Sequence, residues 1–124
     1  MNFILESPAY FKFLDYNISH KQLLIRGENA IESDNIDLAF EATIFLNCPT
    51  TFKGIELYYL DEHSSAEKKV SIFPFTKVFF IKSEGKEYFI QAGILRIFRN
   101  SLALSDSSID MTGREFGSLL WMSP

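Results

Sequence analysis

Hydrophobic and polar side chains alternate along most of this chain, and the alternation is clearest over residues 36–46. Polar or small residues occupy every second position there, apart from Phe45. The positions between them are all apolar: Ile36, Leu38, Phe40, Ala42, Ile44 and Leu46. A period of two over so many residues is typical of a β-strand with one buried face. We therefore expect one continuous strand over 36–46, with these six apolar side chains in the core.

Three shorter segments show the same alternation and are bounded by residues that favour turns. They cover residues 10–16, 21–27 and 54–60. The first two are joined by the sequence NISH at 17–20, which favours a hairpin turn. Residues 47–54 contain both proline and glycine, so we expect a connecting loop before the third segment.

The segment 77–90 differs because it carries bulky apolar side chains at consecutive positions. In a strand, Val78 and Phe80 would point to one face, while Phe79 and Ile81 would point to the other. Both faces of such a strand need covering. The cover would be a second packed layer, the chain's own loop and carboxyl-terminal segment, or a second copy of the chain.

Two glycines mark turning points in this part of the chain. Gly85 lies in the polar turn of the 77–90 hairpin, at a position that favours positive φ. Gly93 interrupts the strand pattern that follows, and glycine inside such a pattern suggests a bulge or a sharp bend. We expect two strand halves, 87–92 and 94–99, bent at Gly93.

The remaining segments have no clear period. We expect a surface loop over 61–76, two very short strands within 101–111, and either a short helix or a closing strand over 112–122. About seven to nine strands at regular spacing, with turn residues between them, indicate an all-β or β-rich α+β fold. The prediction is a single domain over residues 1–124, built as an antiparallel β-sandwich or flattened barrel.

Composition supports the β assignment and limits the choice of partner. The chain has 13 Phe, 5 Tyr and 1 Trp, and aromatic residues favour strands. Its formal net charge of −4 argues against a nucleic-acid partner, which would require clustered Lys and Arg. The sequence lacks the run of about 18 apolar residues that a membrane-spanning helix needs, so we expect no membrane partner. Since Cys48 is the single cysteine, no intrachain disulfide can form, and a reducing cytoplasm is the expected location.

The acidic residues are unevenly placed. No basic residue lies between Arg26 and Lys53, and that interval holds five acids: Glu28, Glu32, Asp34, Asp37 and Glu41. They form either an ordinary solvated strand face or an acidic surface that attracts a basic partner.

The sequence contains no motif that predicts a catalytic, metal or cofactor site. His20 lies in a turn, and His63 stands in a hydrophilic stretch, so both are expected at the surface. Structural zinc needs about four Cys or His ligands, and the chain has only His20, Cys48 and His63. Cys48 has no nearby cation that would activate a thiolate, so we interpret it as a small buried hydrophobic residue.

Aromatic residues opposite the apolar side of their strands complete the functional prediction. Phe45 and Tyr58 are such residues, and exposed aromatics are enriched as anchors of protein interfaces. We expect a small protein without catalysis that binds a protein partner, or a second copy of itself, through Phe45, Tyr58 and the acidic residues. A bacterial immunity or inhibitor protein that covers a basic enzyme cleft would fit this profile, as an analogy of class. The alternatives are a β-barrel that binds a small apolar ligand and, third, an enzyme.

Overall fold

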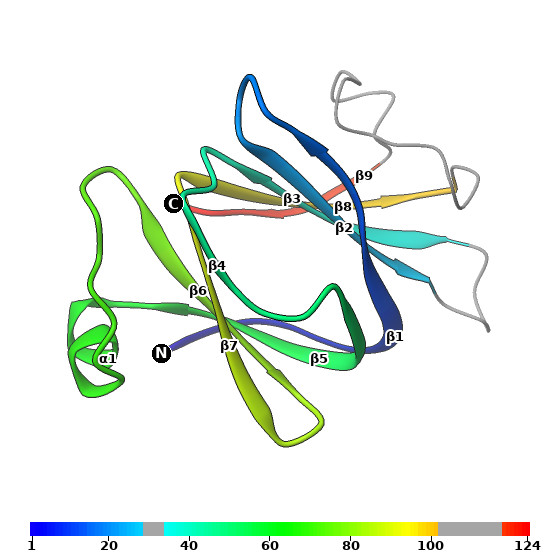
Figure 1. Cartoon of the computed structure of the whole chain (residues 1–124). Helices are drawn as coiled ribbons and strands as arrows, with labels where there is room; N and C mark the ends of the chain where they lie inside the picture. Colours follow the sequence, from blue (N-terminus) through cyan, green and yellow to red (C-terminus); the bar gives the residue numbers. More distant parts are fainter. Residues whose placement is uncertain (29–33, 102–117) are drawn as a thin grey trace.

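The computed structural model describes residues 1–28, 34–101 and 118–124, and most of them belong to one antiparallel sheet (Figure 1). Within these residues the sheet has nine strands, and one short helix accompanies it. The elements in chain order are β1 (Asn2–Asn17), β2 (Gln22–Glu28), β3 (Asn35–Glu41), β4 (Phe45–Asn47), β5 (Thr51–Leu60), α1 (Glu62–Glu67), β6 (Lys77–Ser83), β7 (Lys86–Ala92), β8 (Ile94–Asn100) and β9 (Ser118–Met122). Their order across the sheet is β4–β7–β6–β5–β1–β2–β3–β8–β9. The predicted β-rich fold is therefore confirmed.

The long strand β1 joins two halves of the sheet. Its residues 2–12 pair with β5, and its residues 10–17 pair with β2. The register of β1 shifts at three places, and each shift marks a bulge that bends a strand. The bent sheet folds back on itself, so that the half formed by β4, β7, β6 and β5 faces the half formed by β2, β3, β8 and β9 (Figure 1).

The core fills the space between the two halves. The rings of Phe40 on β3 and Phe79 on β6 meet edge to face with 5.5 Å between their centroids, although three strands separate β3 from β6 in the sheet order. Phe11 on β1 and Phe52 on β5 belong to the same buried cluster. A contact of this kind requires two layers, so the sheet is sandwich-like.

Gly93 is the corner at which the chain passes from one half of the sheet to the other. The strands β7 and β8 are separated by this residue alone, yet β7 lies between β6 and β4, and β8 lies between β3 and β9. The amide of Gly93 donates to the carbonyl of Glu41 at 2.9 Å, which ties the corner to the end of β3. The predicted bend at Gly93 is confirmed, and the two predicted strand halves match β7 and β8 to within a residue.

The prediction of one strand over 36–46 is wrong at its second half. The strand β3 ends at Glu41, and Ala42 has a φ of 52°, a left-handed conformation that stops a strand. The amides of Ala42 and Thr43 donate to the carbonyls of His20 and Lys21 in the β1–β2 turn, at 3.3 Å and 3.0 Å. These bonds redirect the chain toward β7. Only part of the alternating set is therefore in the core, with Leu38 and Phe40 buried, Ile36 half-buried, and Ala42, Ile44 and Leu46 exposed.

The segment 61–76 is only partly the predicted loop, because it contains α1. The carboxylate of Asp61 caps this helix by accepting a hydrogen bond from the Ser64 amide at 2.8 Å. That backbone hydrogen bond holds the pKa of Asp61 below its ordinary value. Among the described residues no helix is long and apolar enough to cross a membrane.

Several smaller predictions have clear outcomes. The expected turn between β1 and β2 is present, although it covers 18–21 rather than 17–20, and Gly85 has the expected positive φ of 75°. The strand β5 begins at Thr51, so the expected connecting loop before it is shorter than 47–54. Residues 118–122 form the closing strand β9, whereas the short strands expected within 101–111 fall almost entirely outside the described residues.

The apolar outer face of β6 is covered by the chain itself. Phe79 and Ile81 point into the main core, while Val78 and Phe80 form a second buried cluster with Leu60 on the other face of the sheet. Val70, which follows α1, packs against this second cluster. Of the covers expected from the sequence, the second packed layer covers the inner face of β6, and the chain's own loop contributes to covering the outer face through Val70.

Candidate interaction surface

The predicted acidic surface requires a correction at Asp37, which is fully buried. Its carboxylate forms a two-pronged ion pair with the guanidinium of Arg26, with Nε to Oδ1 at 2.7 Å and Nη2 to Oδ2 at 2.9 Å. The side-chain amide of Asn100 also donates to Oδ2, at 2.7 Å. These three residues lie on the neighbouring strands β2, β3 and β8. Asp37 is therefore a buried structural residue and does not belong to an exposed acidic face.

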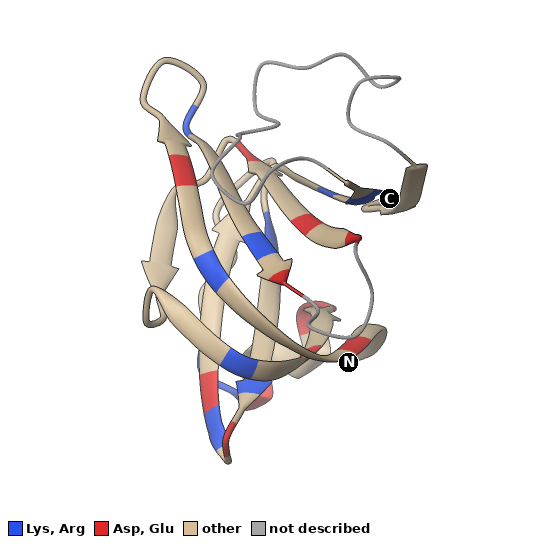
Figure 2. Ribbon diagram, turned by 90° about the vertical axis from the view of Figure 1, so that its right-hand side faces the viewer, with Lys and Arg blue, Asp and Glu red and all other residues tan. Residues whose placement is uncertain are grey.

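The other four acids differ in their surroundings. Glu28 on β2 pairs with Lys12 on β1, with Nζ to Oε1 at 2.6 Å, and Glu41 on β3 pairs with Arg96 on β8. Asp34 is half-buried, and Glu32 lies outside the described residues. Figure 2 shows that acidic and basic residues are interspersed along the strands of this side. Ion pairing of this kind reduces the net negative charge that two of the predicted acids would present to a partner.

The two predicted aromatic residues lie on the outer face of the sheet. Phe45 on β4 is 45 % exposed. Tyr58 on β5 is half-buried between the rings of Phe3 and Phe80, with centroids at 5.7 Å and 5.9 Å. Its hydroxyl donates to Glu56 Oε2 at 3.3 Å, and partial burial together with the charge of Glu56 raises the pKa of Tyr58. Phe45 is thus an accessible anchor, whereas much of the Tyr58 ring packs against the protein.

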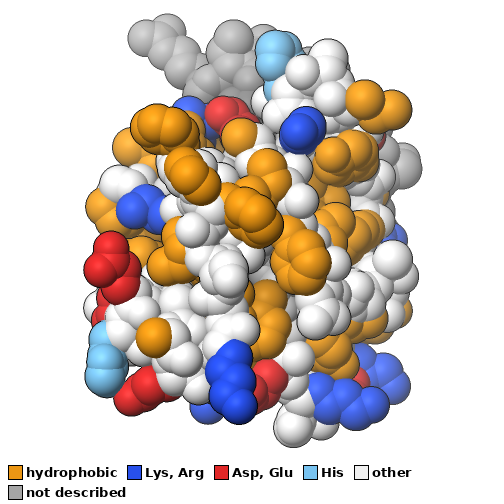
Figure 3. Space-filling model, turned by 60° about the vertical axis from the view of Figure 1, so that its left-hand side comes forward, with side chains coloured by type: hydrophobic (Ala, Val, Ile, Leu, Met, Phe, Trp, Pro, Cys, Tyr) orange, Lys and Arg blue, Asp and Glu red, His pale blue; other side chains and the backbone are white. Residues whose placement is uncertain are grey.

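A larger apolar surface surrounds Phe45, and sequence analysis did not identify it. We call it the β4 surface, and it consists of five exposed residues from two segments: Ile44, Phe45, Ile72, Phe73 and Phe75. Figure 3 shows hydrophobic side chains gathered across the middle of this face. The first segment is the start of β4, at one end of the sheet order, with Ile44 just before it, and the second is the connection between α1 and β6.

The buried side chain of Gln91 on β7 brings the two segments together. Its Oε1 accepts a hydrogen bond from the Phe73 amide at 3.3 Å, and its Nε2 donates to the Ser71 carbonyl at 2.8 Å. Its backbone carbonyl accepts from the Ile44 amide at 2.9 Å. One residue therefore holds both parts of the β4 surface against the sheet.

Phe75 is the most exposed residue of this surface. Its side chain is 100 % exposed, and its φ is 62°. A left-handed conformation costs about 1–2 kcal/mol for a residue with a Cβ, and such strain is concentrated at functional positions. The protein thus presents a bare aromatic ring from a strained backbone.

A groove of about 390 Å³ crosses the β4 surface, and we call it the lysine groove. Phe45, Phe73 and Phe89 provide its aromatic lining, and Lys68 and Lys69 lie along it. Among the described residues, no carboxylate lines it.

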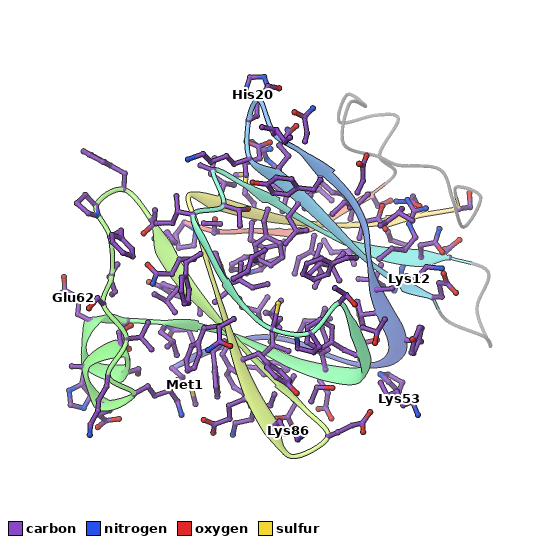
Figure 4. The ribbon with its side chains drawn as sticks, in the orientation of Figure 1. Met1, Lys12, His20, Lys53, Glu62 and Lys86 are labelled. Atoms are coloured by element: carbon purple, nitrogen blue, oxygen red, sulfur yellow. The ribbon has the colours of Figure 1, made fainter. Side chains whose placement is uncertain are left out.

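The histidines lie far apart on the protein. Figure 4 places His20 at the tip of the β1–β2 hairpin and Glu62, next to His63, on α1. His63 is exposed, and its Nε2 lies 2.9 Å from Glu67 Oε1 on the same helix. His20 lines a pocket of about 540 Å³ together with Gln22 and Glu41. The remaining lining residues supply no nucleophile, since they are Ala42, Phe75, Gly93 and Ile94.

The described residues contain no group of three or more His, Cys, Asp or Glu side chains that could hold a metal ion. Cys48 is half-buried and packs against the main core, and burial raises the pKa of its thiol to about 11 from an ordinary 9.0.

We expect Cys48 to react slowly with iodoacetamide while the protein is folded. A pKa of about 11 in place of 9.0 lowers the thiolate fraction at pH 8 about 100-fold, and the thiolate is the reactive species. Alkylation followed by mass spectrometry at pH 8 should be about 10–100-fold slower in buffer than in 8 M urea. Equal rates in the two solvents would show that the thiol is neither buried nor shifted.

Comparisons with known proteins give no functional information. No family model matches the chain, and no curated protein or solved structure is significantly similar to it. The functional argument therefore rests on the residues of this chain.

Proposed function

We propose that this chain is a non-catalytic protein-interaction module that binds a protein partner through the β4 surface. The observation that carries the proposal is the gathering of five exposed, large apolar side chains from two segments far apart in sequence. A contiguous exposed apolar patch on a small protein usually marks an interaction site. Aromatic anchors such as Phe45, Phe73 and Phe75 are the residues that contribute most at protein interfaces.

The backbone also supports this choice of surface. Phe75, within the β4 surface, and Ala42, two residues before Ile44, both have positive φ. Strained residues persist where the surrounding structure holds them and where the strain serves a function. At Phe75 this conformation accompanies a fully exposed ring, although burial of an aromatic side chain is favourable.

The five predicted acids are a weaker candidate for the partner-binding site than the β4 surface. Of its five acids, Asp37 is buried, and Glu28 and Glu41 are ion-paired within the chain. An immunity or inhibitor role that depends on a basic enzyme cleft would rely mainly on Asp34 and Glu32. The same role could be served by the β4 surface, since inhibitors also bind through apolar anchors.

The alternative of a β-barrel for a small apolar ligand has less support. Figure 4 shows side chains filling the space between the two halves of the sheet. Phe11, Phe40 and Phe79 in that space are fully buried. A ligand of ordinary size would have to displace these rings, so the exterior is the better place to look for binding.

The proposal is tested by capture experiments with matched variants. The tagged chain, its Phe73→Ser/Phe75→Ser variant and a Phe3→Ser control are incubated with a lysate of the source cells and chemically cross-linked. Phe3 is 60 % exposed and lies outside the β4 surface, so the control removes an exposed aromatic ring elsewhere. We expect the wild type and the control to capture the same protein, and the double variant to retain less than about one-tenth of it, because interface anchors contribute at least about 1.4 kcal/mol each.

The variants should keep their melting temperatures, because all three rings are largely exposed. Equal capture by the double variant would contradict the proposal. A wild type that captures no protein, and that stays monomeric in sedimentation at millimolar concentration, would contradict it as well.

A further inference from the structure

We infer that the lysine groove binds a partner segment in which a large apolar side chain stands beside carboxylates. This inference rests on the proposed function, because it specifies the chemistry of the partner at the β4 surface. The groove has the size of a site for one side chain and its neighbours, since about 390 Å³ lies within the range of about 300–1,000 Å³ for ligand pockets.

The walls of the groove select an apolar group. Phe45 on β4, Phe89 on β7 and Phe73 in the α1–β6 connection line it from three elements, and Val70 adds a branched aliphatic side chain. Because Phe45 pairs with Gln91 and Asn47 pairs with Phe89, these four side chains share the outer face of the sheet. An aromatic or leucine side chain of a partner would lose contact with water on all of these surfaces at once.

The charges along the groove select an anion. The lining residues that the structure describes include two lysines and no carboxylate, although the chain as a whole carries a net charge of −4. Lys69 is exposed and has no ion pair with any described residue. Lys68 is partly engaged, with its ammonium 3.4 Å from Glu87 and 4.4 Å from the centroid of the Phe80 ring. Lys69 is therefore the first contact for a partner carboxylate, and Lys68 is the second.

The groove is formed before a partner arrives. Gln91 is buried, and its two side-chain hydrogen bonds fix the backbone at Ser71 and Phe73. The amide of Val70 donates to the Ser65 carbonyl at 2.9 Å, which anchors the other end of this segment to α1. A preformed groove avoids much of the ordering cost that weakens binding by flexible loops.

A second copy of the chain is a poorer occupant. A symmetric dimer centred on this groove would place Lys68 and Lys69 of one copy near the same lysines of the other, and like charges at an interface are unfavourable. An acidic and apolar segment satisfies both the aromatic walls and the ammonium groups. It is the occupant that the charges of the groove favour.

Three synthetic peptides test the inference. The first, acetyl-GEDFLDEG-amide, combines apolar side chains with acids, the second replaces the acids by Lys and Arg, and the third replaces Phe and Leu by Ser. Each is titrated into the ¹⁵N-labelled full chain at 50 mM salt. We expect saturable shifts with the first peptide only, confined to the amides of residues 45–47, 68–73 and 89–91, and weaker binding at 500 mM salt.

A matched pair of charge reversals separates the groove from the overall charge. Lys69→Glu should weaken binding of the first peptide about tenfold, whereas Lys86→Glu, which changes the net charge equally, should leave it within about twofold. Lys86 is exposed at the β6–β7 turn, away from the groove (Figure 4). Equal binding of the basic peptide, shifts centred elsewhere, or no binding of the first peptide up to 5 mM would overturn the inference. If the Phe73→Ser/Phe75→Ser variant still loses its captured partner in that case, the proposed function stands and only the partner chemistry is wrong.

Discussion

Replacing Asp37 by alanine is expected to lower the free energy of unfolding by about 3–5 kcal/mol. The substitution leaves the guanidinium of Arg26 buried without the carboxylate that lies 2.7 Å and 2.9 Å from its nitrogens. It also removes one acceptor of the Asn100 side-chain amide. A small domain has a total stability of only about 5–15 kcal/mol, so this variant should be close to unfolding at room temperature. Urea titration monitored by the fluorescence of Trp121 would measure the change.

Two further variants make the Asp37 prediction specific. Glu28→Ala breaks the half-exposed pair with Lys12, and such pairs contribute about 0–1 kcal/mol. The double variant Arg26→Met/Asp37→Leu replaces the buried pair by apolar groups, and it should recover most of the lost stability, as buried pairs often allow. If Asp37→Ala costs no more than Glu28→Ala, the carboxylate is exposed, as its place in an alternating strand had suggested.

The sequence predicts the strands well because a buried face leaves a direct trace in a period-two pattern. The hairpin turn at Gly85 and the corner at Gly93 are also predictable, because glycine is favoured where the backbone takes positive φ or bends sharply. The pattern does not predict the end of β3. Ile44 and Leu46 continue the alternation with the correct period, yet bonds from Ala42 and Thr43 to the distant β1–β2 turn redirect the chain. Contacts between segments that are far apart in sequence decide that point.

The candidate surface was predicted only at Phe45, for a related reason. Asp37 looked exposed because it is charged and alternates with apolar residues, but Arg26 on the neighbouring strand allows it to be buried. A register that pairs Arg26 with Asp37 cannot be deduced from one strand alone. Phe73 and Phe75 lie in a segment without any period, so no pattern marks whether they are covered or displayed. The helix α1 differs, because the sequence does contain a signal for its start. Asp61 is a residue type favoured at a helix N-cap, and its carboxylate accepts a hydrogen bond from the Ser64 amide.

The strand β6 is apolar on both faces, so the effects of removing neighbouring residues on opposite faces can be compared. Phe79→Ala and Phe80→Ala are each expected to lower the free energy of unfolding by about 3–5 kcal/mol. Both rings are fully buried, Phe79 against Phe40 in the main core and Phe80 between Tyr58 and Phe89 on the outer face. Phe3→Ala serves as the control and should cost less than about 1 kcal/mol, because its ring is 60 % exposed.

Hydrogen exchange would distinguish the loss of stability in Phe80→Ala from that in Phe79→Ala. The Phe80 ring lies beneath the ammonium of Lys68 and packs in the cluster that Val70 covers, so its removal should loosen the segment after α1. We expect the amides of Lys68 and Val70, which donate to the carbonyls of Ser64 and Ser65, to exchange faster in Phe80→Ala than in Phe79→Ala at equal global stability. If Phe80→Ala instead costs as little as Phe3→Ala, with unchanged exchange at these two amides, the outer face of β6 is open to water. A hairpin that is apolar on both faces would then itself be part of the binding surface, because only a partner could cover it.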